Sequence, residues 1–287
     1  TRIVARKQLL PTYDVFDEAR YFKPDNRPGI ARTIAGLDLG VTVCEDAWQA
    51  ADMTPSAYAA DPIESLAEWG RQGVKLDATV NLSASPYHSD KLASRIHVCR
   101  TAASILNHPF LMANQVGGND DLLFDGNSLV AWPNGTVVIA PAWKEGVLMV
   151  HLDDPNACEW LPSTAPDALD VGDDQLRHLQ PDDDGREHER EVLHDLADAV
   201  VTGLTDYCRK SGIKSIVLGL SGGIDSAVAA CVAAAAVGPE NVTGIAMPSR
   251  HSSQHSIDDA AHTAASLGLK FDTIPIDSMH ASVEGSI

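Results

Sequence analysis

Residues 214–227 read Lys-Ser-Ile-Val-Leu-Gly-Leu-Ser-Gly-Gly-Ile-Asp-Ser-Ala, and this stretch decides the fold of the chain around it. The apolar run 216–220 has the length of a buried strand, and the alanine-rich run 227–237 favours a helix. At the turn between them Gly222 and Gly223 carry no Cβ, so an anion can approach the main chain and the helix N-terminus closely. The stretch therefore predicts a phosphate-binding turn in a parallel α/β domain.

The turn contains neither Gly-x-Gly-x-x-Gly nor the Gly-Lys-Ser/Thr ending of the commoner phosphate loops. Its sequence Ser-Gly-Gly-Ile-Asp-Ser at 221–226 resembles the pyrophosphate loop of the ATP-pyrophosphatase family, whose members cleave ATP between its α and β phosphates. The resemblance implies a Mg²⁺ ion on Asp225. It also implies ATP contacts from Gly219, Leu220, Ser221, Gly222, Gly223, Ile224, Asp225 and Ser226. Pro-Ser-Arg at 248–250 resembles the turn beside the adenine nucleotide in such enzymes, which implies an ATP contact from Arg250; a structural surface arginine is the alternative. A glycine-rich connector in an ordinary α/β domain is the alternative.

Composition limits the classes of protein to which the chain can belong. A length of 287 residues favours two domains. The 21 basic and 40 acidic side chains give a net charge of 21 − 40 = −19, which argues against a nucleic-acid or membrane surface. Five scattered cysteines without a Cys-x-x-Cys pair favour a reducing cytoplasm over a zinc site or a disulfide framework. Because the sequence begins at Thr1 and stops soon after a strand-like segment, we expect a fragment truncated at both ends.

Cys44 follows a short apolar run, 41–43, that is typical of a strand. A cysteine at the carboxyl end of a strand can act as a nucleophile, and the backbone N–H of Glu45 can then bind the oxyanion. A lone cysteine in this position is more often a small buried apolar residue. The residues around Cys44 and in three other stretches favour the nucleophile.

Residues 6–13 and 43–48 resemble the lysine and cysteine segments of the nitrilase family. Residues 81–88 and 113–120, followed by Phe-Asp-Gly at 124–126, resemble the glutaminase branch that is fused to an NAD synthetase. These four stretches precede the Ser-Gly-Gly-Ile-Asp-Ser turn in the order found in the glutamine-dependent NAD synthetase family. The resemblance spans essentially the whole chain.

The family's pattern implies roles for individual residues. Cys44 would form a glutamyl thioester, and Lys7 would stabilise the thiolate and the oxyanion. The implied glutamine contacts are Tyr13, Ser85 and Lys91. For Tyr13 and Ser85 the alternative is local hydrogen bonding in a polar turn, and for Lys91 it is a solvated helix face shared with Asp90 and Arg95. Neither Glu18 nor Glu45 occupies the position of the family's general base, which lies upstream of the lysine, so thioester chemistry is expected to be impaired in this chain as given.

The resulting domain prediction has three parts. Residues 1–165 are assigned to the C-terminal part of a nitrilase-like αββα sandwich, 166–187 to an acidic linker, and 188–287 to the N-terminal part of a doubly wound, parallel-sheet adenine-nucleotide-binding domain. In the first part we expect strands at 77–82 and 109–114, a helix at 91–106, a hairpin around Asn-Gly at 134–135, and a strand at 147–152 that closes the sheet. In the last we expect a helix at 186–210 and strands at 216–220, 241–247 and 270–276. A metal site in the Asp run 182–184 is the alternative to a linker.

These features predict a glutamine-hydrolysing NAD synthase with ATP and Mg²⁺ as cofactors and with glutamine, deamido-NAD and other copies of itself as partners. Another ATP-pyrophosphatase amidotransferase, such as a GMP synthetase, lacks support because the Gly-x-Cys-x-Gly glutaminase elbow is missing. A stand-alone nitrilase leaves the residues after 190 unexplained. A non-catalytic nucleotide-binding module is a rival of a different class. Next to Arg250, the glutamine-dependent NAD synthetase family would have a tyrosine. This sequence has His251 there, which leaves the contribution of the position open.

Overall fold

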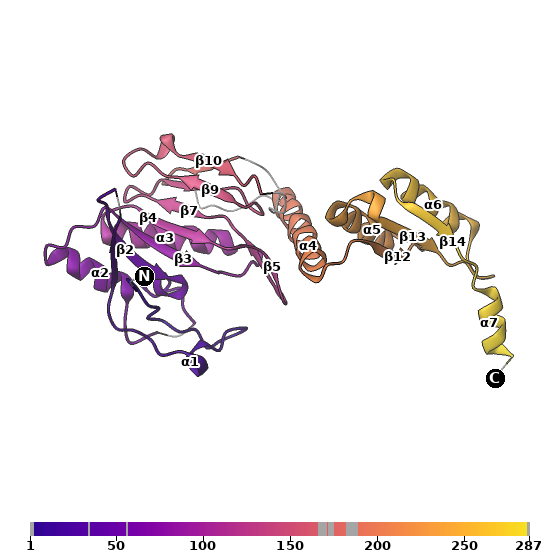
Figure 1. Cartoon of the computed structure of the whole chain (residues 1–287), viewed down its shortest axis with the longest axis horizontal. Helices are drawn as coiled ribbons and strands as arrows, with labels where there is room; N and C mark the ends of the chain where they lie inside the picture. Colours follow the sequence, from indigo (N-terminus) through magenta and orange to yellow (C-terminus); the bar gives the residue numbers. More distant parts are fainter. Residues whose placement is uncertain are drawn as a thin grey trace. The chain divides into compact units, whose positions relative to one another are not determined.

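The structure is a computed structural model that describes residues 3–33, 35–55, 57–165, 171, 175–181 and 189–285. The chain divides into two compact units (Figure 1). Unit 1 comprises Thr1–Gly117 and Leu122–Leu193, and unit 2 comprises Gly118–Asp121 and His194–Ile287.

Unit 1 is built on a sheet with the strand order β1-β2-β3-β4-β7-β8-β11. Strands β2, β3 and β4 are parallel to one another, and the outer pairs are antiparallel. Parallel strands end at the same edge of a sheet, so the residues that follow β2 and β3 are neighbours. The strand bounds are β1 (Gly29–Arg32), β2 (Asp38–Val43), β3 (Ala78–Ser83), β4 (Phe110–Asn114), β7 (Leu129–Ala131), β8 (Val137–Ile139) and β11 (Arg177–Leu179).

Helices α2 (Pro62–Arg71) and α3 (Lys91–Leu106) contact each other and cover one face of this sheet (Figure 1). Helix α2 begins with Pro62 at its first turn, and the Asp61 carboxylate accepts hydrogen bonds from the N–H groups of Ile63 and Glu64. The face of α3 toward the sheet is apolar, as the predicted helical spacing required. The core between helices and sheet includes Ile63, Ile96, Val98, Phe110, Met112 and Leu129.

The opposite face of the sheet carries a separate hairpin of β9 (Gly146–Met149) and β10 (Glu159–Pro162). A second apolar cluster, which includes Val130, Trp132, Val138 and Cys158, is partly covered by Leu148 and Val150. The prediction that 147–152 closes the main sheet is therefore wrong. The edge position next to β8 is taken by β11, whose register pairs Arg177 with Ile139.

Shorter elements complete the N-terminal part of the chain. They are α1 (Glu18–Tyr21), the 3-10 turns η1 (Cys44–Ala47), η2 (Gln49–Ala51) and η3 (Pro155–Ala157), and the hairpin of β5 (Val116–Asn119) and β6 (Leu122–Asp125). The tip of this hairpin, Gly118–Asp121, belongs to unit 2. Strand β11 lies inside the stretch predicted as an acidic linker, so that stretch contains sheet structure. The Asp run 182–184 lies outside the described residues.

Unit 2 includes α4 (Glu189–Ser211) from His194 onward and contains a parallel sheet in the order β12-β13-β14. Helices α5 and α6 connect these strands and pack against each other. Small side chains make that close packing possible, because Ala230, Ala260 and Ala264 are buried at 0–1% exposure. The elements are β12 (Ile216–Gly219), α5 (Ile224–Val237), η4 (Pro239–Asn241), β13 (Val242–Ala246), α6 (Gln254–Leu267), β14 (Lys270–Thr273) and α7 (Asp277–Glu284).

The described part of the chain ends in a helix, and its helices are not membrane spans. Helix α7 follows β14, so a helix and not a strand-like segment is the last described element. Among the described helices, none has the combination of length and apolar character that would let it cross a membrane.

Candidate active sites

Cys44 is the first residue after β2 and opens the turn η1. Its φ of 49° lies in the left-handed region, which non-glycine residues rarely occupy and which is enriched at functional sites. The Asn81 side chain on the neighbouring strand β3 donates a hydrogen bond to the Cys44 carbonyl oxygen at 3.2 Å. The Cys44 side chain is partly exposed, whereas Cys99 on α3 is fully buried. The predicted strand-end position of Cys44 is confirmed.

A cavity of about 750 Å³ in unit 1 is lined by both Lys7 and Cys44. The structure thus brings together two residues that are 37 positions apart in the sequence. The Lys7 ammonium donates to both carboxylate oxygens of Glu18 at 2.6 Å, and both side chains are largely buried. Glu18 also lines the cavity, on the short helix α1. Sequence analysis did not select Glu18 as a site residue, because only the fold of the 11–18 segment carries it back to Lys7.

The carboxylate of Glu45 forms a second polar group beside Cys44. The side chain of Glu45 is 5% exposed and accepts hydrogen bonds from the Tyr13 hydroxyl at 2.8 Å and the Tyr58 hydroxyl at 3.2 Å. Burial, reinforced by Glu45, raises the pKa of both tyrosines, so both hydroxyls remain donors at neutral pH. Tyr58 lies in an irregular loop without a recognisable motif, and sequence analysis missed it.

Ser85 lies near the start of the loop after β3, and Lys91 is the first residue of α3. Ser85 is 3% exposed and accepts a hydrogen bond from Arg95 Nε at 3.2 Å. The Lys91 ammonium lies 4.3 Å from the centre of the Trp48 ring, a cation–π contact. Burial, with a smaller contribution from Arg95, lowers the pKa of Lys91. Within the described part of the chain, the residues that line the Cys44 cavity do not include Tyr13, Ser85 or Lys91, and their glutamine contacts stay predictions.

The alternative of a solvated helix face shared with Arg95 is wrong for that residue, because the Arg95 side chain is 0% exposed. Its guanidinium donates to Asp125 at 2.6 Å and to the Ser85 carbonyl oxygen at 2.9 Å. Asp125 also accepts from the Asn127 amide at 2.6 Å. One buried cation therefore joins helix α3, the loop after β3 and the turn after β6.

The predicted phosphate turn lies in unit 2 between β12 and α5. The Ser226 hydroxyl accepts from the Ser221 N–H at 3.2 Å and donates to the Gly223 carbonyl oxygen at 2.9 Å, so the two serines hold the turn closed on itself. Gly222 has a φ of 79°, and a Cβ on it would lie 2.2 Å from the Ser256 carbonyl oxygen on α6. Only glycine fits this position.

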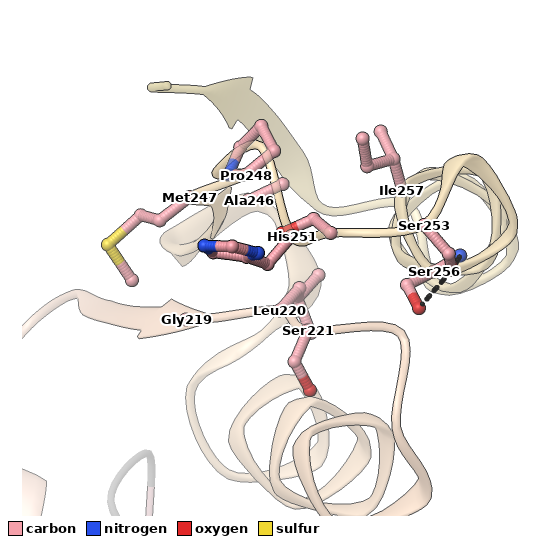
Figure 2. Close-up of a pocket in the computed structure, with 11 residues that line it drawn as sticks. Gly219, Leu220, Ser221, Ala246, Met247, Pro248, His251, Ser253, Ser256 and Ile257 are labelled. Atoms are coloured by element: carbon pink, nitrogen blue, oxygen red, sulfur yellow. Dashed lines mark hydrogen bonds between the residues drawn. The ribbon is translucent and has the colours of Figure 1, made fainter. Parts of the chain in front are cut away.

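A cavity of about 440 Å³ opens beside the turn (Figure 2). It is lined by Gly219, Leu220 and Ser221 from the end of β12, together with residues from the end of β13 and the start of α6. Figure 2 shows these three groups facing the same space, with Met247, Pro248 and His251 on the loop after β13. Of the predicted ATP residues, Gly222, Gly223, Ile224, Asp225 and Ser226 belong to the adjoining turn and the first turn of α5.

Arg250 is engaged elsewhere. Its backbone N–H donates to Asp277 at 2.7 Å, and its guanidinium is ion-paired with Glu284 on α7. In the part of unit 2 that the structure describes, the residues lining the 440 Å³ cavity do not include Arg250. Its ATP contact stays a prediction.

The residues of the turn are compatible with a bound Mg²⁺. Among the described residues there is no group of three His, Cys, Asp or Glu side chains that could hold a metal by themselves. Mg²⁺ at phosphate sites commonly takes one or two carboxylates, with phosphate oxygens and waters as its other ligands. Asp225, in the first turn of α5, can supply the single carboxylate of such a site.

Comparison with known proteins adds to this geometry. Residues 3–160, more than half of the chain, match the carbon-nitrogen hydrolase family. The chain belongs to the carbon-nitrogen hydrolase family. Residues 196–287 match the NAD synthase family, so two different families match the N-terminal and the C-terminal parts of the chain.

Several curated relatives match along nearly the whole chain. It is 38% identical to the glutamine-dependent NAD(+) synthetase of Synechocystis sp. and 39% identical to that of Rhodobacter capsulatus, over 98% and 100% of this chain and 46% of each relative. A solved glutamine-dependent NAD+ synthetase from Acinetobacter baumannii in complex with ADP is 29% identical, with a TM-score of 0.72 over 98% of this chain and 47% of that one. The predicted resemblance and fold class are confirmed. This carbon-nitrogen hydrolase chain spans about half the length of these relatives.

Proposed function

We propose that the protein carrying this chain is a glutamine-dependent NAD synthetase. Unit 1 releases ammonia from glutamine, and unit 2 activates the carboxylate of deamido-NAD by adenylation with ATP. Ammonia then displaces AMP and leaves NAD. The observation that carries the proposal is the presence, in one chain, of the Lys7–Cys44 cavity and the 221–226 phosphate turn.

In unit 1 the Cys44 thiolate attacks the carbonyl carbon of the glutamine side-chain amide. The C–N bond then breaks, the amide nitrogen takes up the proton that the Cys44 thiol gave up and leaves as ammonia, and water hydrolyses the remaining thioester to glutamate and the free thiol. The Lys7 ammonium, held by Glu18 in the same cavity, stabilises negative charge on the thiolate and the oxyanion. The N–H of Glu45, directly after the nucleophile, supplies a further donor for the oxyanion.

In unit 2 the turn between β12 and α5 binds the phosphates of ATP. The absence of a Cβ on Gly223 and the N-terminal end of the 14-residue helix α5 favour an anion at this turn, whereas Gly222 makes room for helix α6. Asp225 would hold Mg²⁺, which neutralises phosphate charge when bound. Bound ADP in the Acinetobacter relative supports an adenine nucleotide as the ligand.

The finer parts of the proposal are the domain bounds and the cellular setting. We assign 1–165 to the glutaminase domain, 166–187 to a connecting segment that contributes β11 to the sheet of that domain, and 188–287 to the ATP-binding domain. The two family matches, 3–160 and 196–287, support this division. A cytoplasmic location and a homo-oligomeric assembly stay predictions.

The test is NAD formation by the complete protein from deamido-NAD, ATP and Mg²⁺, run in parallel with glutamine and with an ammonium salt. Synthesis with both donors is expected. ATP binding without AMP or pyrophosphate release under either condition would contradict the proposal and favour a non-catalytic nucleotide-binding module.

A further inference from the structure

Asp46 lies two residues after Cys44, and its side chain is 1% exposed. Its carboxylate accepts three hydrogen bonds, all from backbone N–H groups. One oxygen, Oδ1, accepts from Gln8 at 2.9 Å and from Leu9 at 2.8 Å, and the other, Oδ2, accepts from Val43 at 3.0 Å. The carboxylate thus bridges two chain segments that are more than 30 residues apart in the sequence.

The donors of these hydrogen bonds flank the two residues that matter for the thioester chemistry. Gln8 and Leu9 directly follow Lys7, whereas Val43 directly precedes Cys44. The Lys7 side chain is further fixed by Glu18, and the Cys44 backbone is held in the left-handed region. The backbone on both sides of the Lys7–Cys44 pair is therefore tied to one side chain.

Burying a carboxylate between two segments costs free energy, because the charged group loses its contact with water. Burial raises the pKa of Asp46, and the three N–H donors offset this only in part. An uncharged amide would avoid most of that cost, but it offers a single acceptor oxygen. Both Asp46 oxygens are needed here, because one serves the Lys7 segment and the other serves the Cys44 segment.

We propose that Asp46 is a positioning residue that sets the separation between the Lys7 ammonium and the Cys44 thiol. This inference rests on the proposed glutaminase function of unit 1. Asp46 does not contact the substrate. It controls how closely the Lys7 ammonium approaches the Cys44 thiol. The thiolate of Cys44 is stabilised only while the ammonium is close.

Asp61 offers a matched control in the same unit. Its carboxylate also accepts two backbone N–H groups, from Ile63 at 3.0 Å and Glu64 at 3.1 Å, and burial also raises its pKa. Both bonds go to the same oxygen, so Asp61→Asn can keep them, whereas Asp46→Asn must give up the bonds on one oxygen. Asp61→Ala removes the cap of α2 and supplies a variant of reduced stability.

The experiment compares Asp46→Asn, Asp61→Asn and Asp61→Ala in the complete protein. The first measurement is the pH dependence of Cys44 alkylation by iodoacetamide, followed by mass spectrometry of the Cys44 peptide because Cys231 is also exposed. It needs no substrate. The second is kcat and KM for glutamine, and the third is the rate with an ammonium salt.

Asp46→Asn is expected to move the alkylation profile to higher pH and to lower the glutamine kcat by roughly 10- to 100-fold, with KM and the ammonium rate little changed. Both Asp61 variants should keep the wild-type profile. If Asp46→Asn does not fold, Asp46→Glu keeps both oxygens but lengthens the side chain, and it should shift the profile in the same direction.

A wild-type alkylation profile in a folded Asp46 variant would overturn the positioning role, even if the melting temperature fell. The same shift in Asp61→Ala would also overturn it, because stability alone would then explain the effect. Failure of the wild-type protein to make NAD with either donor would instead contradict the proposed function, and the alkylation comparison would still decide the role of Asp46.

Discussion

The turns after β2 and after β12 both follow the carboxyl end of a parallel strand, yet they expose different chemistry. After β2 a non-glycine residue, Cys44, takes a φ of 49° and presents a thiol side chain. After β12 the left-handed position is Gly222, with a φ of 79°, and the turn leads into the N-terminal end of helix α5. A nucleophile requires a side chain and an anion is favoured by a helix N-terminus, so the same place in an α/β fold can serve the two proposed reactions.

The largest expected effect follows from the absence of a side chain in the second turn. Gly222→Ala places a Cβ 2.2 Å from the Ser256 carbonyl oxygen and in an unfavourable φ region, so the turn or helix α6 must move. Synthesis with glutamine and with ammonium should both fall below detection in a steady-state NAD assay.

Gly70→Ala is the control for that substitution, because a Cβ there meets nothing within 4 Å and the position is inside helix α2. It should leave both rates unchanged and stabilise the protein by about 0.5–1 kcal/mol. Normal ammonium-driven synthesis by Gly222→Ala would show that the turn does not bind the phosphates.

A smaller effect, confined to unit 1, is expected from Arg95→Met. The substitution leaves the Asp125 carboxylate buried without its cation, which should lower the free energy of unfolding by about 3–5 kcal/mol. Urea denaturation of the complete protein, followed by amide hydrogen exchange of α3, would measure the loss. Arg100→Met is the matched control on the same helix. It removes hydrogen bonds to the Gly135 and Gln180 carbonyl oxygens near the surface and should cost much less.

The smallest effect is expected at Glu45. Tyr58→Phe removes one of the two tyrosine donors and leaves the Tyr13 hydrogen bond in place. The loss of one hydrogen bond to a carboxylate corresponds to about 1–2 kcal/mol, or a five- to thirtyfold lower kcat/KM for glutamine. The ammonium-driven rate should be unchanged, and a parallel fall in both rates would place Tyr58 outside the glutamine site.

The sequence predicts local secondary structure best. The helix at 91–106 is confirmed at both ends, and the strands before Cys44 and before the phosphate turn lie where expected, because apolar periodicity and turn residues act over a few positions. The hairpin around the Asn-Gly pair is also confirmed, with β7 and β8 in antiparallel register.

Long-range pairing could not be predicted in the same way. Strand β11 has three residues and no strand pattern, and only its contact with β8 makes it a strand. The strand predicted at 147–152 pairs with β10 instead of closing the sheet, since an apolar run does not specify its partner.

Side-chain partnerships at the candidate sites show the same limit. Motif resemblance selected Lys7 and Cys44, and the structure places both on one cavity. Glu18, Tyr58 and Asp46 were not predicted, because their partners are set by how loops fold back on the sheet. Arg95 was grouped with a solvated face because charge alone does not reveal a buried ion pair.

The division of labour between the two turns is tested most directly by one comparison in the complete protein, Cys44→Ala against Asp225→Ala, with glutamine and with ammonium as donors. Cys44→Ala should abolish NAD synthesis from glutamine and keep the wild-type rate with ammonium, whereas Asp225→Ala should abolish both. Loss of ammonium-driven synthesis in a folded Cys44→Ala protein would contradict the assignment of the two reactions to separate turns.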